Sequence, residues 1–261
     1  MQEQAATLAD HQLPIMVVSH ERSGTHFMMN ALAECFGYVS KPWVNVDKDQ
    51  LNFNYFQAPN LRTAMLAIAQ ARAPNIIKCH QEFGFYSSII SDFKDVLQII
   101  YVYRNPADVM ASFWRFVQSW SWMEGPRTDT ALEFAKAAPM GNLMRFQYRQ
   151  YETMLDRWAN HVEHWLGAAE RTTNIHPVKY EDLARRYEVT VKGLGATLAL
   201  RPTRIVRPSR TENVVAGGSV DYAPAPGSDN RDAVAELAIA KFPALMAALG
   251  YAGEARKLMS A

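Results

Sequence analysis

Lys78 and His80 are the residues whose types and spacing best suit chemistry. They lie two positions apart at the end of the short apolar run Asn75–His80, and in an extended strand such positions face the same side. An imidazole there can take a proton from a hydroxyl, and an ammonium can neutralise negative charge that develops in a transition state. The pair predicts a catalytic site at the end of a strand, with a purely structural histidine as the alternative.

A second site is predicted where Arg22-Ser23-Gly24-Thr25 follows the apolar run Pro14–Val18. The run shows no alternation, which indicates a strand buried on both faces, and a helical pattern begins at Thr25. Amides at a helix N-terminus bind anions, Gly24 lets a ligand approach closely, and Arg22 adds a fixed positive charge. The loop is not a Walker A motif, because no Lys follows the glycine. An ordinary strand–helix turn is the other interpretation.

A third site is predicted at Arg104, which follows the long apolar run Val96–Tyr103. Asn105 is a good helix N-cap, so Arg104 is expected at a junction between a central strand and a helix. Ser112 lies about two turns along that helix, on a similar side. An arginine at such a junction suits bidentate phosphate recognition, whereas a salt bridge to Asp108 is the structural alternative.

Strands that alternate with helices predict an α/β fold, as a single domain with a central, mainly parallel sheet flanked by helices. Strands are expected over 14–18, 75–80, 96–103 and 175–180, and helices from 25, over 61–72, from 106, over 128–170 with a break at 139–141, over 188–200 and over 231–248. Residues 36–56 are expected to form an aromatic-rich loop. Residues 203–230 are expected to form a lid or a mobile loop, and residues 1–13 a flexible start.

The composition is that of an ordinary globular protein, with 261 residues, 49% hydrophobic residues and a formal net charge of +1. Such a charge gives no global field that would attract nucleic acid or an anionic membrane. Cys35 and Cys79 form neither a disulfide framework nor a metal-ligand spacing, which points to a reducing compartment. Residues 1–13 lack the apolar core of a signal peptide. We therefore expect a cytoplasmic protein. His161 and His164 are expected at the surface or core edge, with no metal site around them.

Taken together, these segments make the chain resemble the sulfotransferases that use 3′-phosphoadenosine 5′-phosphosulfate (PAPS). The loop Arg22–Thr25 is similar to the family's P-K-S-G-T loop for the 5′-phosphosulfate, and Tyr101–Phe113 matches its 3′-phosphate motif nearly position by position. Lys78-Cys79-His80 resembles the family's K-x-H strand end, and Tyr180–Leu183 its Y-E-D-L. The closing Leu249-Gly250-Tyr251 is similar to bacterial members. The resemblance implies a P-loop-like sulfotransferase fold.

The resemblance also implies a role for each matching residue. PAPS is the implied co-substrate and its desulfated product, PAP, the implied nucleotide product, with no metal. The 5′-phosphosulfate would be held by Arg22 and by the loop residues Ser23, Gly24, Thr25 and His26. The 3′-phosphate would be held by Arg104 and Ser112. The adenine would lie beside Tyr180. His80 would be the general base. Glu21, which flanks the loop, is the reserve candidate for that role. Lys78 and Arg22 would neutralise the charge of the moving sulfonate and the leaving phosphate oxygen.

Two departures from the family pattern bear on these roles. Arg22 stands where many members have lysine, so this side chain stabilises charge without donating a proton. The usual C-terminal R-K-G-x-x-G-x-W element is not recognisable, and Arg210 is the candidate for a second 3′-phosphate ligand. Aromatic residues in 36–56 and 113–123 suggest a small-molecule acceptor, an aromatic or apolar alcohol, although such loops also stack on sugars. The sequence does not indicate the oligomeric state. Two other functions compete with this interpretation: a P-loop kinase, and a nucleotide-binding protein that has lost catalysis.

Overall fold

The computed structural model describes residues 12–45, 58–70, 75–120, 122–208, 212–213, 218–219 and 229–252. Its centre is a five-stranded sheet in the order β2-β3-β1-β4-β5, and every pairing in it is parallel. The strands are β1 Ile15–Ser19, β2 Val39–Asn45, β3 Asn75–Cys79, β4 Gln98–Tyr103 and β5 Ile175–Lys179. The α/β class and the parallel sheet are thereby confirmed.

The strand β1 lies at the centre of the sheet, between β3 and β4. All five of its residues are buried, as the uninterrupted apolar run predicts for a strand covered on both faces. Because the strands are parallel, the residues that follow β1, β3 and β4 emerge at the same edge of the sheet. This edge carries all three sites predicted from the sequence, and it is where ligands bind in open α/β sheets.

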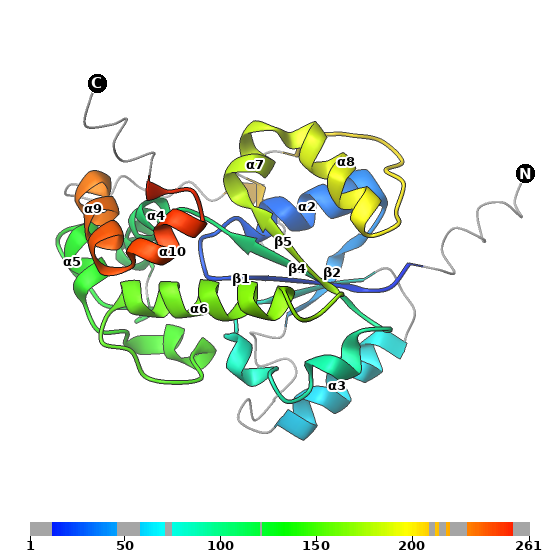
Figure 1. Cartoon of the computed structure of the whole chain (residues 1–261), viewed down its shortest axis with the longest axis horizontal. Helices are drawn as coiled ribbons and strands as arrows, with labels where there is room; N and C mark the ends of the chain where they lie inside the picture. Colours follow the sequence, from blue (N-terminus) through cyan, green and yellow to red (C-terminus); the bar gives the residue numbers. More distant parts are fainter. Residues whose placement is uncertain are drawn as a thin grey trace, which may run out of the picture.

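Helices cover both faces of the sheet (Figure 1). On one face lie α2 (Thr25–Phe36), α7 (Tyr180–Arg185) and α8 (Tyr187–Thr197). On the other face lie α3 (Ala58–Gln70) and α6 (Met154–Ala169). The side chains of β1 alternate between the two layers, with Ile15 and Val17 in the first apolar cluster and Met16 and Val18 in the second. This alternation explains why the strand has no polar face.

A third apolar cluster lies beyond the carboxyl edge of the sheet (Figure 1). It is formed mainly by α4 (Pro106–Ser119), α5 (Ala131–Lys136), α9 (Arg231–Lys241) and α10 (Pro243–Ala248). Residues of α6 also contribute to it. Asn105 caps α4 as expected, since its side chain accepts a hydrogen bond from the Ala107 amide at 2.9 Å. The short 3-10 helices η2, η3 and η4 span Phe83–Phe85, Ile90–Phe93 and Gly141–Phe146.

Three predicted boundaries are wrong. The expected loop over 36–56 contains β2, an edge strand in which Pro42 is tolerated because an edge leaves N–H groups unpaired. The register of β2 shifts between Val39 and Val44, and residues 46–57 lie outside the described residues. The expected helix over 128–170 is α5, η4 and α6 with irregular chain between them. The closing helix is broken at Phe242, where Pro243 begins α10.

Most of the expected lid over 203–230 lies outside the described residues, as does the expected flexible start up to residue 11. The described part includes β6 Glu212–Asn213 and β7 Gly218–Ser219, which pair as an antiparallel ladder. The preceding segment is attached to the domain, because the Thr203 amide donates to the Cys35 carbonyl at 2.8 Å and the Tyr187 hydroxyl donates to the Val206 carbonyl at 2.8 Å.

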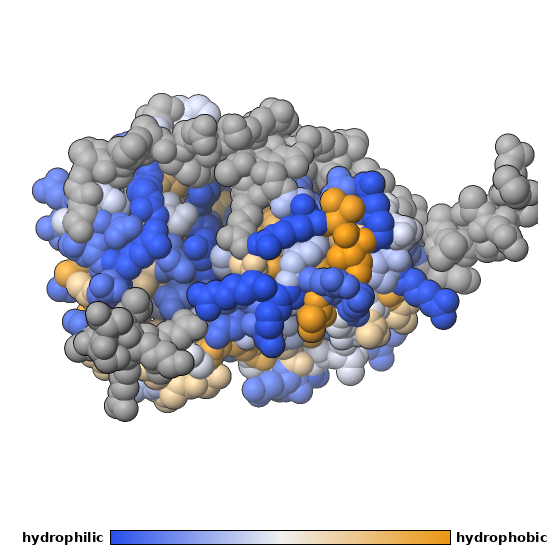
Figure 2. Space-filling view, turned by 90° about the horizontal axis from the view of Figure 1, so that it is seen from above, coloured by the Kyte–Doolittle hydropathy of each residue, from blue (hydrophilic) through white to orange (hydrophobic). Residues whose placement is uncertain are grey.

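The face formed by α7 and α8 is mainly hydrophilic, with a band of hydrophobic residues across it (Figure 2). Val189 of α8 is among the exposed hydrophobic residues, at 68%. Across the residues described, no helix combines the length and the apolar character that crossing a bilayer requires.

Candidate active site

The loop after β1 forms a tight, buried turn into α2. Ser19 at the end of β1 contacts Thr25 at the start of α2, with 2.6 Å between the two hydroxyl oxygens. The Ser23 amide donates to the His20 carbonyl at 3.2 Å, so this amide is used by the turn itself. The first intrahelical bond runs from Met28 N–H to Gly24 O. The amides of the first turn therefore precede the hydrogen-bond ladder of α2, as an anion site at a helix N-terminus requires.

Gly24 is required for both its backbone conformation and its contact with Tyr180. Its φ of 102° lies in the region that favours glycine. A Cβ atom on Gly24 would lie 2.3 Å from Cδ2 of the Tyr180 ring. The absence of a side chain thus lets the first residue of α7 pack directly on the loop. The predicted phosphosulfate loop and the predicted adenine-side tyrosine are neighbours.

Arg104 links these two parts to the helix α4. Its guanidinium lies over the Tyr180 ring, 4.3 Å from the centroid, and its Nη1 donates to the Arg22 carbonyl at 3.3 Å. Nη2 also lies 3.6 Å from Asp108 Oδ2. The salt bridge considered as the structural alternative therefore exists, and it coexists with the contacts to the loop. Glu181 fixes the same junction, because its Oε1 accepts from the Asn105 amide at 3.0 Å.

Arg22 reaches from the loop to α4. Its Nε donates to Ser112 Oγ at 3.2 Å, and its guanidinium lies 5.2 Å from the centroid of the Phe116 ring. Arg22 itself has a positive φ of 65°, an uncommon conformation for a residue with a side chain. The two predicted 3′-phosphate residues and the loop arginine thus come together within one cluster, which also includes Tyr180.

His80 is joined to the end of β1 by a hydrogen bond. Its Nδ1 lies 2.9 Å from the Ser19 carbonyl oxygen, and the residue is 8% exposed. Because a carbonyl can only accept, Nδ1 must carry the proton. In the neutral ring Nε2 then holds the lone pair, which is the state a general base needs. The Phe146 ring packs edge-on against His80 at a centroid distance of 5.7 Å.

The electrostatics of the site keep its histidines neutral and favour anions. Burial, followed by the positive charge of Lys78, lowers the pKa of His80 well below its usual value. Burial, Lys78 and Arg22 lower the pKa of His26 to about 3. Lys78 is itself 9% exposed. These shared influences place Lys78, His80, His26 and Arg22 in one positively charged, poorly solvated region.

The atoms of the loop and of Arg104 fit a bound polyanionic nucleotide. Among the described residues, Ser23 Oγ and Arg104 Nε are buried without a hydrogen-bond partner. Both atoms can donate hydrogen bonds to phosphate or sulfate oxygens. The described residues contain no group of three or more His, Cys, Asp or Glu side chains suited to hold a metal ion.

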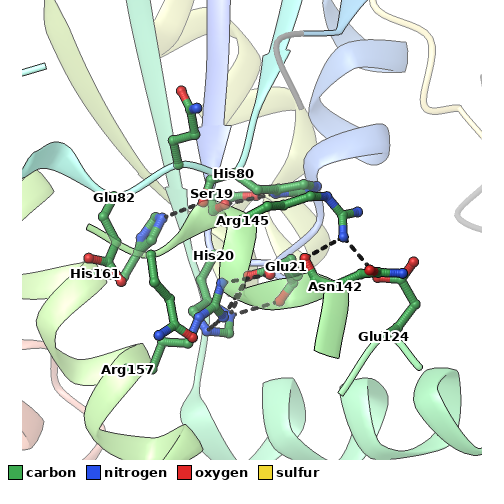
Figure 3. Close-up of polar contacts among 12 residues, drawn as sticks. Ser19, His20, Glu21, His80, Glu82, Glu124, Asn142, Arg145, Arg157 and His161 are labelled. Atoms are coloured by element: carbon green, nitrogen blue, oxygen red, sulfur yellow. Dashed lines mark hydrogen bonds and ion pairs between the residues drawn. The ribbon is translucent and has the colours of Figure 1, made fainter. Parts of the chain in front are cut away.

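Glu21, the reserve candidate for the base, is engaged in a buried ion pair with Arg157 of α6 (Figure 3). Arg157 Nη1 and Nη2 lie 2.8 and 2.7 Å from the two carboxylate oxygens. Arg157 Nη1 also lies 2.8 Å from Nε2 of His20, and its side chain is fully buried. Both carboxylate oxygens of Glu21 are thus used in the ion pair with Arg157.

His161 and Arg157 are functional-site residues that the sequence interpretation missed. His161 was expected at the surface or core edge, and this is wrong, because it is 0% exposed and its Nε2 lies 3.2 Å from the His80 carbonyl oxygen. A signal for both was present in the sequence. Arg157 and His161 are four residues apart in an amphipathic helix whose neighbours are apolar, so they share its buried side.

The remaining predicted residues divide into buried, exposed and undescribed ones. Phe113 and Trp114 belong to the core, whereas Trp120 and Trp122 are 38% and 64% exposed. Phe116, Trp120 and Trp122 form a row of ring contacts at 5.0 and 6.1 Å, which begins beside Arg22. Arg210 lies outside the described residues.

Comparisons with known proteins agree on one family. A family model described as a sulfotransferase domain matches residues 12–214. Sulfotransferase 1A1 of Canis lupus familiaris is 24% identical over 194 residues, which are 70% of this chain and 59% of that protein. Sulfotransferase 1A1 of Bos taurus is 25% identical over 154 residues, 56% of this chain and 46% of that protein. The chain thus spans about half the length of these relatives.

Among solved structures, the crystal structure of mouse sulfotransferase SULT7A1 complexed with PAP resembles this chain with a TM-score of 0.48. Its sequence is 17% identical, and the match covers 75% of this chain and 62% of that one.

Proposed function

The chain belongs to the sulfotransferase domain family, and on that premise we propose that it transfers a sulfuryl group from PAPS to a hydroxyl or amine of a small-molecule acceptor. The observation that carries the proposal is the 2.9 Å hydrogen bond between His80 Nδ1 and the Ser19 carbonyl. It ties a neutral imidazole to the strand that leads into the anion-binding loop. A base and an anion cradle are thereby held at one edge of the sheet.

The nucleotide is held at two corners in this proposal. The first-turn amides of α2 and the hydroxyls of Ser23 and Thr25 bind the 5′-phosphosulfate. Arg104 and Ser112 bind the 3′-phosphate, and the adenine lies beside Tyr180. Support comes from the contacts that already join these corners, since Arg104 lies over the Tyr180 ring and donates to the Arg22 carbonyl.

His80 acts as the general base. The donor supplies a sulfuryl group activated by its bond to phosphate, and His80 Nε2 takes the proton that the acceptor hydroxyl loses. Lys78 and Arg22 neutralise the charge on the moving sulfonate and on the phosphate oxygen that leaves. Transfer of this kind depends mainly on alignment and electrostatic stabilisation, and Lys78 and Arg22 supply the latter in this proposal.

An aromatic or apolar alcohol is the proposed acceptor. The Phe146 ring packs against His80, and the row of Phe116, Trp120 and Trp122 begins next to Arg22. Both features place apolar surface near the residues proposed for catalysis. A reducing, cytoplasmic location is proposed as well, because Cys35 and Cys79 are both buried free thiols.

Nucleotide titration followed by an acceptor screen tests the function. PAP should raise the melting temperature without Mg²⁺, whereas ATP should not, since the loop has no Walker lysine. Phenols, apolar alcohols, amines and glycans are then incubated with labelled PAPS. Stabilisation by ATP with Mg²⁺ and not by PAP would reject the proposal in favour of a kinase. Turnover only on a polysaccharide would reject the small-molecule acceptor.

A further inference from the structure

Three buried side chains of α6 contact the ends of the two strands that carry the proposed site. Arg157, His161 and Trp165 follow one another at intervals of four residues, and each is 0% exposed. Four residues are slightly more than one helical turn, so the three side chains follow one side of the helix. We name these three residues the α6 row.

The first member of the row holds the loop after β1. Arg157 contacts both carboxylate oxygens of Glu21 at 2.7 and 2.8 Å and Nε2 of His20 at 2.8 Å. Since Arg157 is a permanent donor, His20 Nε2 accepts, and His20 Nδ1 donates to the Glu21 carbonyl at 3.0 Å. The two residues that precede Arg22 are therefore fixed by one guanidinium, as Figure 3 shows.

The next two members hold the end of β3. His161 Nε2 lies 3.2 Å from the His80 carbonyl oxygen, and Trp165 Nε1 donates to the Gln81 carbonyl at 3.1 Å. Because the His80 carbonyl can only accept, His161 carries its proton on Nε2. Its Nδ1 then accepts from the Tyr101 hydroxyl at 3.0 Å. Tyr101 of β4 thus fixes the ring that in turn fixes the backbone of His80.

We propose that the α6 row is a positioning device that sets the distance between the general base and the phosphosulfate loop. The inference rests on the proposed function, because it assigns the row a role in that reaction. Arg157 and His161 belong to one rigid helix and hold the loop and the base respectively. A displacement of about 1 Å in such an arrangement can reduce the rate about 100-fold.

The contacts of the row differ from those of the other buried residues of α6. Trp158 and Val162 pack into the apolar cluster formed with α4 and α5. Trp165 packs into the apolar cluster on the α3 side of the sheet, but all three members of the row also donate to backbone or polar side-chain atoms of the segment after β1 or the segment after β3. A buried ion pair such as Arg157–Glu21 adds little stability compared with apolar packing. A positional role accounts for its presence at the loop.

Substitution of His161 separates positioning from packing. His161→Leu removes the donor to the His80 carbonyl, whereas His161→Gln keeps an N–H group near the Nε2 position. We expect His161→Leu to lower kcat about 10- to 100-fold with the Kd of PAP within about twofold of wild type, and His161→Gln to restore most of the loss. Val162→Ala, the next residue of α6, is the matched control, and it should lower the melting temperature without changing kcat.

The ring nitrogens of His80 provide a readout that does not require turnover. In wild type, ¹⁵N NMR should show a proton on Nδ1 and none on Nε2. His161→Leu should produce a mixture of the two tautomers, and Val162→Ala should not. If wild type shows no turnover with any acceptor while this change is seen, the proposed reaction fails, and what stands is that His161 holds the segment around His80. An unchanged His80 spectrum, or kcat in His161→Leu equal to that of Val162→Ala, would overturn the positioning role.

Arg157→Lys tests the other half of the device. Lysine keeps a positive charge beside Glu21 but cannot hold both carboxylate oxygens and His20 at once. The loop should loosen, so the Kd of PAP should rise about 10-fold while kcat at saturating PAPS stays within about threefold. An equal loss of kcat in Arg157→Lys and His161→Leu, with no change in PAP affinity, would contradict separate control of loop and base.

Discussion

The Nδ1 atom of His80 lies 2.9 Å from the carbonyl oxygen of Ser19, so the residue that follows β3 is tied to the last residue of β1. The Ser19 hydroxyl lies 2.6 Å from the Thr25 hydroxyl, so the same residue also reaches the start of α2. Ser19 thereby connects the proposed base to the proposed phosphosulfate loop. Four predictions follow from this arrangement and its surroundings.

His80→Asn should abolish most of the turnover and leave the nucleotide site intact. The asparagine amide can keep an N–H group toward the Ser19 carbonyl, but it has no basic nitrogen. We expect kcat to fall about 10²- to 10⁴-fold, with the Kd of PAP from calorimetry within about twofold of wild type. His164→Asn, the same change at a half-buried position of α6, should leave both values unchanged. Normal turnover in His80→Asn would show that another group is the base.

Gly24→Ala should destabilise the protein through the loop. The new Cβ would lie 2.3 Å from the Tyr180 ring, and the φ of 102° is unfavourable for alanine. We expect chemical denaturation to show a loss of about 1–3 kcal/mol and a weaker affinity for PAP. Gly193→Ala is the control, because Gly193 is an exposed residue within α8 with no atom near its Cβ position. That variant should gain about 0.4–1 kcal/mol, and a similar gain in Gly24→Ala would refute the packing argument.

Much of the site could be predicted because its signals are local. The apolar run that ends at Ser19, the glycine at the helix start and the N-cap Asn105 are each decided by a few neighbouring residues. Sequence order alone then brings Arg22, His80 and Arg104 to one edge of a parallel sheet. The contacts between Arg22 and Ser112 and between Gly24 and Tyr180 could not be predicted in the same way, because they depend on how the loop, α4 and α7 pack together.

The parts that escaped prediction depend on distant residues. Arg157 pairs with Glu21 across 136 positions, and no local pattern shows which carboxylate a buried arginine will meet. His161 was misplaced because a histidine among aromatic residues fits either a core or its edge. The edge strand β2 was missed because Pro42 is a loop signal, although a proline costs nothing at a position where no ladder bond is needed.

Arg104→Gln and Ser112→Ala should each reduce the preference for a 3′-phosphate. PAP and adenosine 5′-phosphate differ only in that group, so the ratio of their affinities isolates it. Loss of a hydrogen bond to a charged group amounts to about 1.5–3 kcal/mol, and PAP should bind roughly 10- to 150-fold more weakly to Arg104→Gln. Adenosine 5′-phosphate should bind nearly as before.

The control for nucleotide selectivity is Arg115→Gln. Arg115 lies on the same helix α4, three residues after Ser112, and it pairs with Asp229 at 3.1 Å. Its substitution removes one positive charge from the same helix without removing a proposed ligand of the 3′-phosphate. Equal weakening of PAP and adenosine 5′-phosphate in Arg104→Gln, or equal loss in Arg115→Gln, would show that Arg104 contributes only general positive charge.

Acidification should destabilise the protein through its buried histidines. Burial is the main cause that lowers the pKa of every described histidine, and four of them are shifted furthest, namely His20, His26, His80 and His161. Below about pH 6.5 the unfolded chain takes up protons at these rings while the folded protein does not, so the free energy of unfolding falls as the pH falls. Each histidine can contribute a slope of up to about 1.4 kcal/mol per pH unit. Above about pH 6.5 the rings are neutral in both states and contribute no slope.

Glu82 acts in the opposite sense, because burial raises its pKa and the folded protein keeps a proton that the unfolded chain loses above its usual pKa. A single carboxyl group is outweighed by four histidines, so we expect a net loss of stability between pH 7 and pH 5. Urea denaturation at pH 8, 7, 6 and 5 measures this dependence. His161→Gln removes one titrating ring and should flatten the slope by up to about 1.4 kcal/mol per pH unit. Stability that rises as the pH falls from 7 to 5 would contradict the prediction that burial keeps these rings neutral in the folded protein.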